Sequence, residues 1–161
     1  MVLVTEDIID QQMEELANSS TAFEESLVAL RREQPVIGGY LFTENHEVFT
    51  DAEREMLLFL TVVIWQAAAE AADGALPEVS GDQLAEAEEI NWELLPTGKK
   101  MDFRAKLDPF FDNYPQEDLL ALVEDSLTAE DEDEDAERLT EEGREALFIS
   151  LKSIIDVLTL P

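Results

Sequence analysis

One apolar segment constrains the fold of this chain more than any other feature. Twelve of the fourteen residues from Met56 to Ala69 are apolar. Thr50 and Glu53 precede the segment with the spacing of a capping box, and Gly74 follows it, so the sequence predicts a helix over about residues 51–73. A helix that is apolar on nearly all faces must be surrounded by other helices. We therefore expect a central helix, with an apolar run too short to span a membrane.

Amphipathic helices are predicted on both sides of this segment. Apolar residues recur at intervals of three and four, the period of a helix with one buried face. Thr5, Thr21 and Thr140 are predicted to cap three of these helices. The predicted apolar stripes are Ile9–Met13–Leu16, Phe23–Leu27–Leu30, Leu84–Ala87–Ile90–Leu94, Phe103–Leu107–Phe110, Leu119–Leu120–Leu122–Val123 and Leu147–Leu151–Ile154–Leu158.

Prolines divide the chain into shorter elements. Pro35 ends one helix or begins the next element, and Val36 to Phe42 is predicted to be a short helix, with a strand as the weaker alternative. Pro115 can occupy the first turn of a later helix. No segment has the alternating pattern that is typical of a strand. The predicted fold is therefore all-α, a single compact domain of about seven to eight helices over residues 1–161.

Two stretches of the chain resemble each other at a nearly constant offset. Shifted by 80, Phe23, Leu27, Leu30 and Pro35 coincide with Phe103, Leu107, Phe110 and Pro115, and shifted by 90, residues 49–55 coincide with 139–145. We predict two pseudo-repeated helical halves, 1–80 and 81–161, with an acidic loop at 128–138 as the insertion. The helices after Thr50 and Thr140 should then pack together near a pseudo-twofold axis. Their predicted buried contacts are Leu57, Leu60, Ile64, Leu147, Leu151 and Ile154.

The chain is strongly acidic. It carries 39 Asp and Glu residues against 10 Lys and Arg residues, for a formal net charge of -29. Such a charge repels nucleic acids and anionic membranes and attracts basic proteins. The absence of cysteine excludes disulfides, thiolate nucleophiles and cysteine zinc sites. Residues 1–7 lack the basic region of a signal peptide, so we expect a cytoplasmic protein.

No group of residues meets the requirements of a catalytic site. His46 is the only histidine and stands in a polar segment, which favours an exposed loop residue over a proton shuttle or metal ligand. Lys99 and Lys100 follow Gly98 and could contact an anion, but an exposed turn is the simpler interpretation. We therefore predict no catalytic, cofactor-binding or metal-ligating residue, no cofactor, and a protein that is not an enzyme.

The acidic insertion matches part of a calcium-binding loop. Asp131, Asp133 and Asp135 stand at positions 1, 3 and 5 of a twelve-residue loop that would end at Glu142. However, Ala136 stands where the sharp turn of such a loop requires glycine. We therefore expect a mobile, solvated acidic loop rather than a specific calcium site.

Both tryptophans are predicted to pack in the core. Trp65 lies inside the apolar segment, and Trp92 lies in an acidic stretch from which its ring can fold inward. The alternative for Trp92 is a partly exposed anchor at an interface.

Three classes of function are compatible with these features. The leading hypothesis is a non-enzymatic protein-protein interaction or adaptor module whose acidic surface attracts a basic protein partner. The first alternative is a nucleic-acid mimic that inhibits a basic nucleic-acid-binding protein, which requires carboxylates arrayed along one elongated face. The second alternative is a small-ligand-binding or enzymatic protein with a pocket between the two helical halves.

Overall fold

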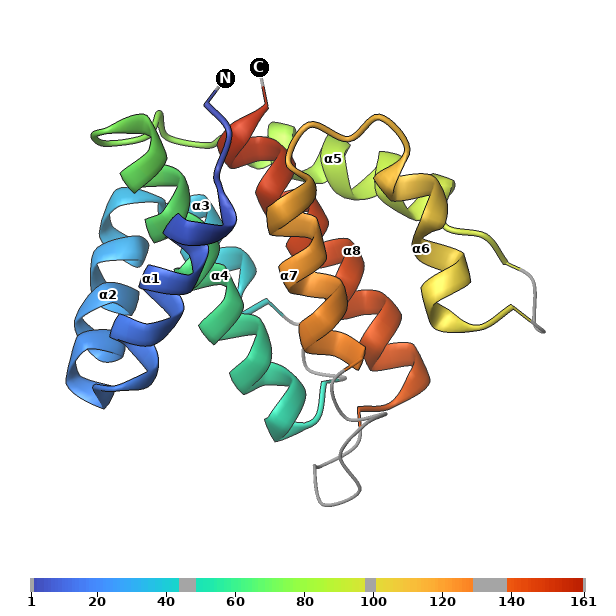
Figure 1. Ribbon diagram of the computed structural model, residues 1–161, viewed down its shortest axis with the longest axis horizontal. Helices are drawn as coiled ribbons and strands as arrows, with labels where there is room; N and C mark the ends of the chain where they lie inside the picture. The colour runs from blue at the N-terminus through green and yellow to red at the C-terminus, as the bar shows by residue number, and fades with distance from the viewer. Residues whose placement is uncertain (1, 44–48, 98–100, 129–138, 161) are drawn as a thin grey trace.

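The periodic apolar residues form helices throughout the part of the chain that the structure describes. In the computed structural model this part comprises residues 2–43, 49–97, 101–128 and 139–160. Eight helices and no strand occur within these ranges, which confirms the all-α prediction (Figure 1). The helices are α1 (Glu6–Ala17), α2 (Ser20–Glu33), α3 (Pro35–Tyr40), α4 (Asp51–Ala72), α5 (Gly81–Leu94), α6 (Phe103–Phe111), α7 (Glu117–Thr128) and α8 (Glu141–Thr159).

Two long helices lie at the centre of the molecule. Figure 1 shows α4 and α8 between α1 and α2 on one side and α6 on the other. α4 packs against α1, α2 and α8, and α8 packs against α4, α5 and α7. α4 is therefore central, as predicted, and α8 shares that position with it. The predicted contact residues each expose at most 2% of their surface and are Leu57, Leu60, Ile64, Leu147, Leu151 and Ile154.

The length of α4 corrects one expectation. The helix has 22 residues and is long and apolar enough, by length and composition, to cross a membrane. However, 50% of its most apolar stretch is buried inside the domain, against three neighbouring helices. Its packing is that of a core helix.

The two threonine caps of the central helices are confirmed. Thr50 Oγ1 accepts a hydrogen bond from Glu53 N at 3.2 Å, and Thr140 Oγ1 accepts one from Gly143 N at 2.9 Å. Each bond satisfies one of the backbone amides that the first turn of a helix leaves without an internal partner. A threonine thus sets where each of the two central helices begins.

The two other predicted caps are wrong in detail. α2 begins two residues before the expected position, because Ser19 rather than Thr21 accepts the capping bond, from Ala22 N at 3.1 Å. Thr5 stands at the N-cap of α1 without a side-chain capping bond. Instead, Asp118 Oδ2, at the start of α7, accepts from the first backbone amide of α1 at 3.1 Å. A distant carboxylate therefore takes the place of the local cap.

Glu53 joins the starts of α4 and α8. Its side chain is fully buried, and its Oε1 accepts a hydrogen bond from Thr50 N at 2.9 Å. Its Oε2 accepts bonds from Thr140 N at 2.8 Å and from Thr140 Oγ1 at 3.0 Å. One carboxylate thus lies at the positive ends of two helices. Gly143 completes the fit, because a Cβ atom at this position would overlap the Glu53 carboxylate.

Two buried glutamines hold extended segments by their backbones. Gln116 accepts from a backbone amide of segment 2–4 at 3.0 Å and donates to a carbonyl of the same segment at 2.9 Å. Gln34 makes the same pair of bonds, each 2.9 Å long, with segment 77–79. The segment before α1 is therefore held by a residue of the second half, and the segment before α5 by a residue of the first.

The halves share their order of elements but not the lengths of those elements. Among the described residues each half contains four helices, the last of which begins at a threonine cap. However, α2 has 14 residues and α6 has 9, while α3 has 6 and α7 has 12, so corresponding helices of the two predicted halves differ in length. Pro35 is the first residue of α3, whereas Pro115 precedes the first residue of α7 by two positions. The duplication itself stays a prediction.

Trp92 is not a core residue, which corrects the sequence interpretation. It exposes 42% of its surface. α5 turns Leu84 and Asn91 inward, and successive residues of a helix are rotated by about 100°. Trp92 therefore points away from the buried stripe.

Truncation of Leu151 should destabilise the fold strongly. Leu151→Ala removes a fully buried side chain from the central helix pair, and we expect it to lower the free energy of unfolding by about 2–5 kcal/mol. Urea unfolding of the variant and the parent measures the difference. The control is Val28→Ala, which truncates an exposed side chain. A loss below about 1 kcal/mol for Leu151→Ala would contradict the described core.

The Glu53–Gly143 contact predicts a non-additive pair of substitutions. Gly143→Ala should lower the free energy of unfolding by about 1–3 kcal/mol, because the added methyl group overlaps the Glu53 carboxylate. In a Glu53→Ala background the same change should be neutral or stabilising, because alanine favours a helix over glycine by about 1 kcal/mol. Gly39→Ala, where an added Cβ meets no atom within 4 Å, is the matched control. Additive losses in the double variant would refute the contact.

Candidate functional site

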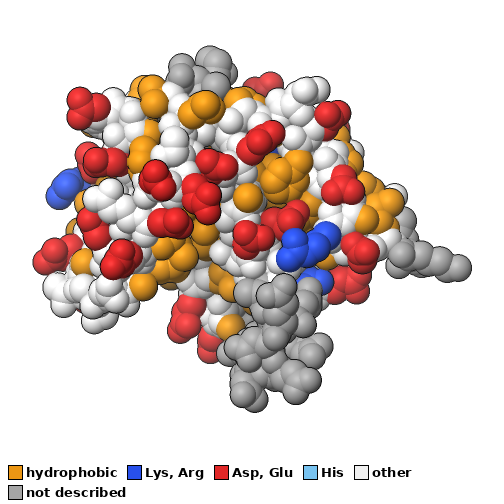
Figure 2. Space-filling view, in the orientation of Figure 1, with side chains coloured by type: hydrophobic (Ala, Val, Ile, Leu, Met, Phe, Trp, Pro, Cys, Tyr) orange, Lys and Arg blue, Asp and Glu red, His pale blue; other side chains and the backbone are white. Residues whose placement is uncertain are grey.

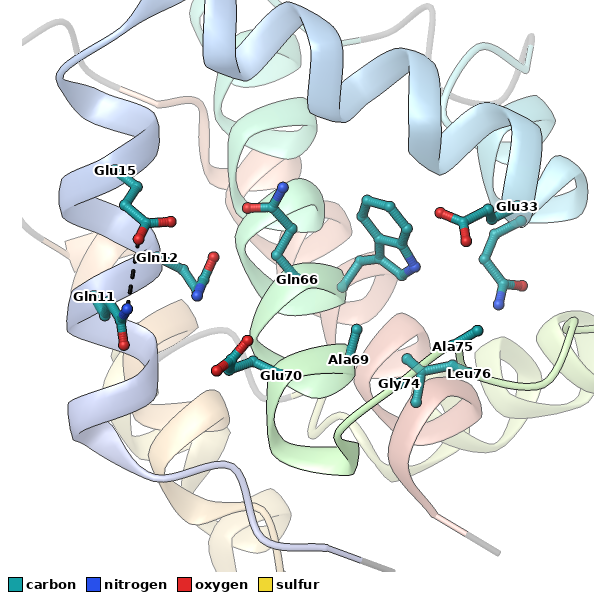
Figure 3. Close-up of a pocket in the computed structure, with 12 residues that line it drawn as sticks. Gln11, Gln12, Glu15, Glu33, Gln66, Ala69, Glu70, Gly74, Ala75 and Leu76 are labelled. Atoms are coloured by element: carbon teal, nitrogen blue, oxygen red, sulfur yellow. Dashed lines mark hydrogen bonds between the residues drawn. The ribbon is translucent and has the colours of Figure 1, made fainter.

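A polar pocket opens beside the central helix pair. It has a volume of about 470 Å³ and lies between α1, the end of α2, the C-terminal half of α4 and the turn after it (Figure 3). All of its lining residues fall between positions 11 and 76. The pocket therefore belongs to the first half of the chain, whereas the sequence suggested a cleft between the halves.

The lining is rich in carboxylates and amides and contains no basic side chain. Three glutamates, four glutamines and one tryptophan contribute to it, with a rim of small and apolar residues. The polar and aromatic members are Gln11, Gln12, Glu15, Glu33, Gln34, Trp65, Gln66 and Glu70. Such a lining favours a cationic ligand and disfavours an anionic one.

The polar side chains approach the pocket from opposite walls. Figure 3 shows Gln12 and Glu15 extending from α1 toward α4, and Glu70 extending from α4 toward α1. Glu33, at the end of α2, points inward from the other side of the pocket. A positively charged group in this space would therefore have carboxylates on more than one side.

The C-terminal end of α4 adds to the negative potential. Ala69, Glu70 and Gly74 line the pocket, and they surround the last turn of this helix. The turn closes as Gly74 N donates to Ala69 O at 3.2 Å, with Asp73 in the left-handed conformation at φ 54°. We expected Gly74 to close the helix, and Asp73 shares that role. The carbonyl end of a helix carries a partial negative charge that favours a nearby cation.

Some pocket side chains are committed to the fold, and others are not. Both polar atoms of Gln34 are used in holding segment 77–79, and Gln66 Nε2 donates to Ser26 Oγ at 2.6 Å. Gln12 and Trp65 make no hydrogen bond through their side chains with any residue that the structure describes. They expose only 6% and 8% of their surface, respectively. The deep wall of the pocket therefore offers polar groups that the protein does not use.

A second polar cluster lies between α5 and α8 and is closed to ligands. Lys152 Nζ contacts Asp156 Oδ2 at 2.7 Å and donates to Asn91 Oδ1 at 3.1 Å. Asn91 Nδ2 donates to Ser153 Oγ at 2.9 Å, and Tyr114 donates to Asp156 Oδ1 at 2.6 Å. The ammonium group also lies 4.4 Å from the centre of the Tyr114 ring. These bonds use the polar groups of the cluster, so it stabilises the contact between two helices.

Two tyrosine hydroxyls are protected from ionisation. Burial, together with the charge of Asp156, raises the pKa of Tyr114 well above its usual value. Burial also raises the pKa of Tyr40, which donates to Glu88 Oε2 at 2.9 Å and lies 2.9 Å from Ser150 Oγ. Both phenols therefore remain neutral donors in the folded protein.

Several residues singled out in the sequence lie outside the described part of the chain. These are His46, Lys99, Lys100, the acidic insertion and the partial calcium motif at Asp131, Asp133 and Asp135. Among the residues that the structure does describe, no three Asp, Glu or His side chains gather closely enough to hold a metal ion.

The sequence interpretation did not identify the glutamines of the pocket, although Gln66 gave one indication of it. Gln66 is one of only two polar residues in the apolar run of α4, and it marks the face that α4 turns to the pocket. Trp65, predicted to be packing, is buried and also forms part of the pocket wall. Gln12 stands on the buried side of an acidic helix, where no periodic rule requires an amide.

No family model, curated protein or solved structure matches this chain. The pocket and the charge of the surface are therefore the basis for assigning a function.

Alkaline pH should destabilise the protein through its tyrosines. The raised pKa values keep both phenols protonated in the folded state, whereas an unfolded tyrosine ionises at about pH 10. Stability is therefore fully present below about pH 10 and is lost as the pH rises above that value. Tyr114→Phe should flatten this loss and should cost about 1–3 kcal/mol at neutral pH, because Asp156 loses a donor.

Urea unfolding at a series of pH values measures both effects. Because the chain has only 2 tyrosines, phenolate absorbance reports on Tyr40 and Tyr114 alone. The phenolate absorbance should appear only as the helical circular dichroism signal is lost. If phenolate formed in the folded protein at about pH 10, the two tyrosine hydroxyls would not be buried donors.

Proposed function

We propose that this protein is a non-enzymatic binding module that holds a basic segment of a protein partner. The observation that carries the proposal is the pocket between α1, α2 and α4, which is lined by three glutamates and by no basic side chain. A formal net charge of -29 would draw a basic partner toward the protein before the pocket is reached.

The distribution of the exposed carboxylates supports a binding module rather than a nucleic-acid mimic. In the described part of the chain, exposed Asp and Glu residues occur on α1, α2, α4, α5, α6, α7 and α8. Figure 2 shows acidic side chains scattered over one face of the molecule among apolar and neutral atoms. A mimic requires a row of carboxylates with a spacing like that of phosphates. Within the described ranges, the spread of exposed acids over seven helices does not favour such a row.

The polar clusters favour binding over catalysis. A catalytic group needs access to a substrate, and the cluster around Lys152 is buried and uses its polar atoms internally. The open pocket offers carboxylates and amides without a histidine or a lysine to transfer protons. These groups suit recognition of a cationic segment.

The proposal predicts salt-sensitive binding that depends on the pocket. The probe is a labelled nine-residue peptide with three arginines separated by glycine and serine, followed by fluorescence anisotropy. We expect binding to weaken by about tenfold as salt rises from about 50 mM to about 300 mM, because ions screen exposed charges. Glu15→Gln with Glu70→Gln should weaken binding at low salt by about tenfold.

The control is a second pair with the same change in net charge. Glu86→Gln with Glu89→Gln alters two exposed carboxylates of α5, away from the pocket, and should change affinity by less than about twofold. An absence of peptide binding at low salt would refute the proposed function. Equal losses in the two pairs would show that general charge, and not the pocket, holds the peptide.

A further inference from the structure

Two mostly buried side chains of the pocket make no internal hydrogen bond. Gln12 and Trp65 are more than nine-tenths buried, and neither side chain makes a hydrogen bond with a described residue. Figure 3 shows the amide of Gln12 directed from α1 into the space in front of α4. Their polar atoms remain within reach of solvent in the pocket, since among the described residues Thr61 Oγ1 is the only deeply buried side-chain N or O atom without a partner. These polar atoms are therefore available to a ligand that enters the pocket.

The unused groups match a ligand that both donates and accepts hydrogen bonds. The indole N–H of Trp65 can only donate, and the amide of Gln12 can do both. The carboxylates of Glu15, Glu33 and Glu70 can only accept when ionised. A peptide meets both requirements, because its backbone carbonyls accept and a cationic side chain donates.

The number and placement of the acceptors distinguish arginine from lysine. Glu15 and Glu70 face each other across the pocket, and Glu33 points in from the far side. A guanidinium group has five N–H donors spread around a plane, whereas an ammonium group has three at one point. Guanidinium is also less strongly hydrated and stacks on aromatic rings such as that of Trp65. Acceptors on opposite walls beside an indole therefore fit arginine better.

We propose that the pocket binds the guanidinium group of an arginine within a peptide segment, with Gln12 and Trp65 bonding to the peptide beside it. This assignment rests on the proposed function and specifies its ligand. Glu15, Glu33 and Glu70 neutralise the charge of the guanidinium group, and the carbonyl end of α4 adds to the attraction.

The test measures the preference for arginine and the environment of Trp65 together. Trp92→Phe serves as the background, because Trp92 lies on α5 outside the pocket and its removal leaves Trp65 as the only tryptophan. The probes are the nine-residue arginine peptide, its lysine counterpart and its citrulline counterpart, which keeps the shape of arginine without the charge. The arginine peptide should bind about tenfold more tightly than the lysine peptide and should change Trp65 emission with the same Kd. The citrulline peptide should not bind measurably.

Two variants separate a specific site from general attraction. Gln12→Met keeps the size of the side chain and removes its polar atoms, and should weaken arginine-peptide binding by about fivefold without altering unfolding in urea. Glu89→Gln should change binding by less than about twofold. Equal binding of the arginine and lysine peptides, or unchanged Trp65 emission at saturation, would overturn the inference. The proposed function would survive that result if the Glu15 and Glu70 variants still weakened binding.

Competition by small organic cations tests whether the ligand is a peptide. Arginine amide and spermine are organic cations without a peptide backbone. We expect each to compete only at concentrations about a hundredfold above the Kd of the peptide, because they offer few carbonyls to Gln12 and Trp65. Competition near that Kd would overturn the assignment of a peptide and identify a free organic cation as the ligand.

Discussion

The architecture depends on one buried carboxylate at the meeting point of two helix starts. The backbone amides at the start of a helix carry partial positive charge, so the first turns of α4 and α8 would repel each other at close range. Glu53 lies between them and accepts bonds from Thr50 and from both the amide and the hydroxyl of Thr140. Burying an isolated charge is costly, and these donors offset that cost. Glu53 thus fixes α4 beside α8, and α1, α2, α5 and α7 pack on this pair of helices.

The elements of this fold were predictable because they depend on local signals. Thr50 and Thr140 cap helices within three residues of chain, and the apolar run of α4 indicates burial without reference to any partner. The contact of Glu53 with Thr140 was not predictable, since its partners are 87 residues apart in the chain. The prediction that Trp92 packs in the core was wrong for a related reason. The acidic stretch around it does not reveal which face α5 turns to α8.

The pocket was missed for a physical reason. Its walls are made of glutamine and glutamate on helices whose sequence periodicity explains only their apolar faces. In an acidic chain such residues are expected at the surface, and only the packing of α1 against α4 makes Gln12 a buried group. The predicted repeat aligns Glu53 of α4 with Gly143 of α8, and the contact between these two residues gives a physical reason for the difference. A single carboxylate serves two caps, so the position that would hold a second one is left to glycine.

The glutamine contacts have a consequence for the order in which the chain can acquire its structure during synthesis. Segment 2–4 is synthesised before Gln116, which holds it and stands 112 positions after Val4. Asp118, which bonds to the first amide of α1, arrives later still. Segment 2–4 and the first amide of α1 therefore gain these partners only after residues 116–118 have been synthesised. Closing so large a loop costs conformational entropy, so these contacts form late compared with the local contacts within α1 and α2.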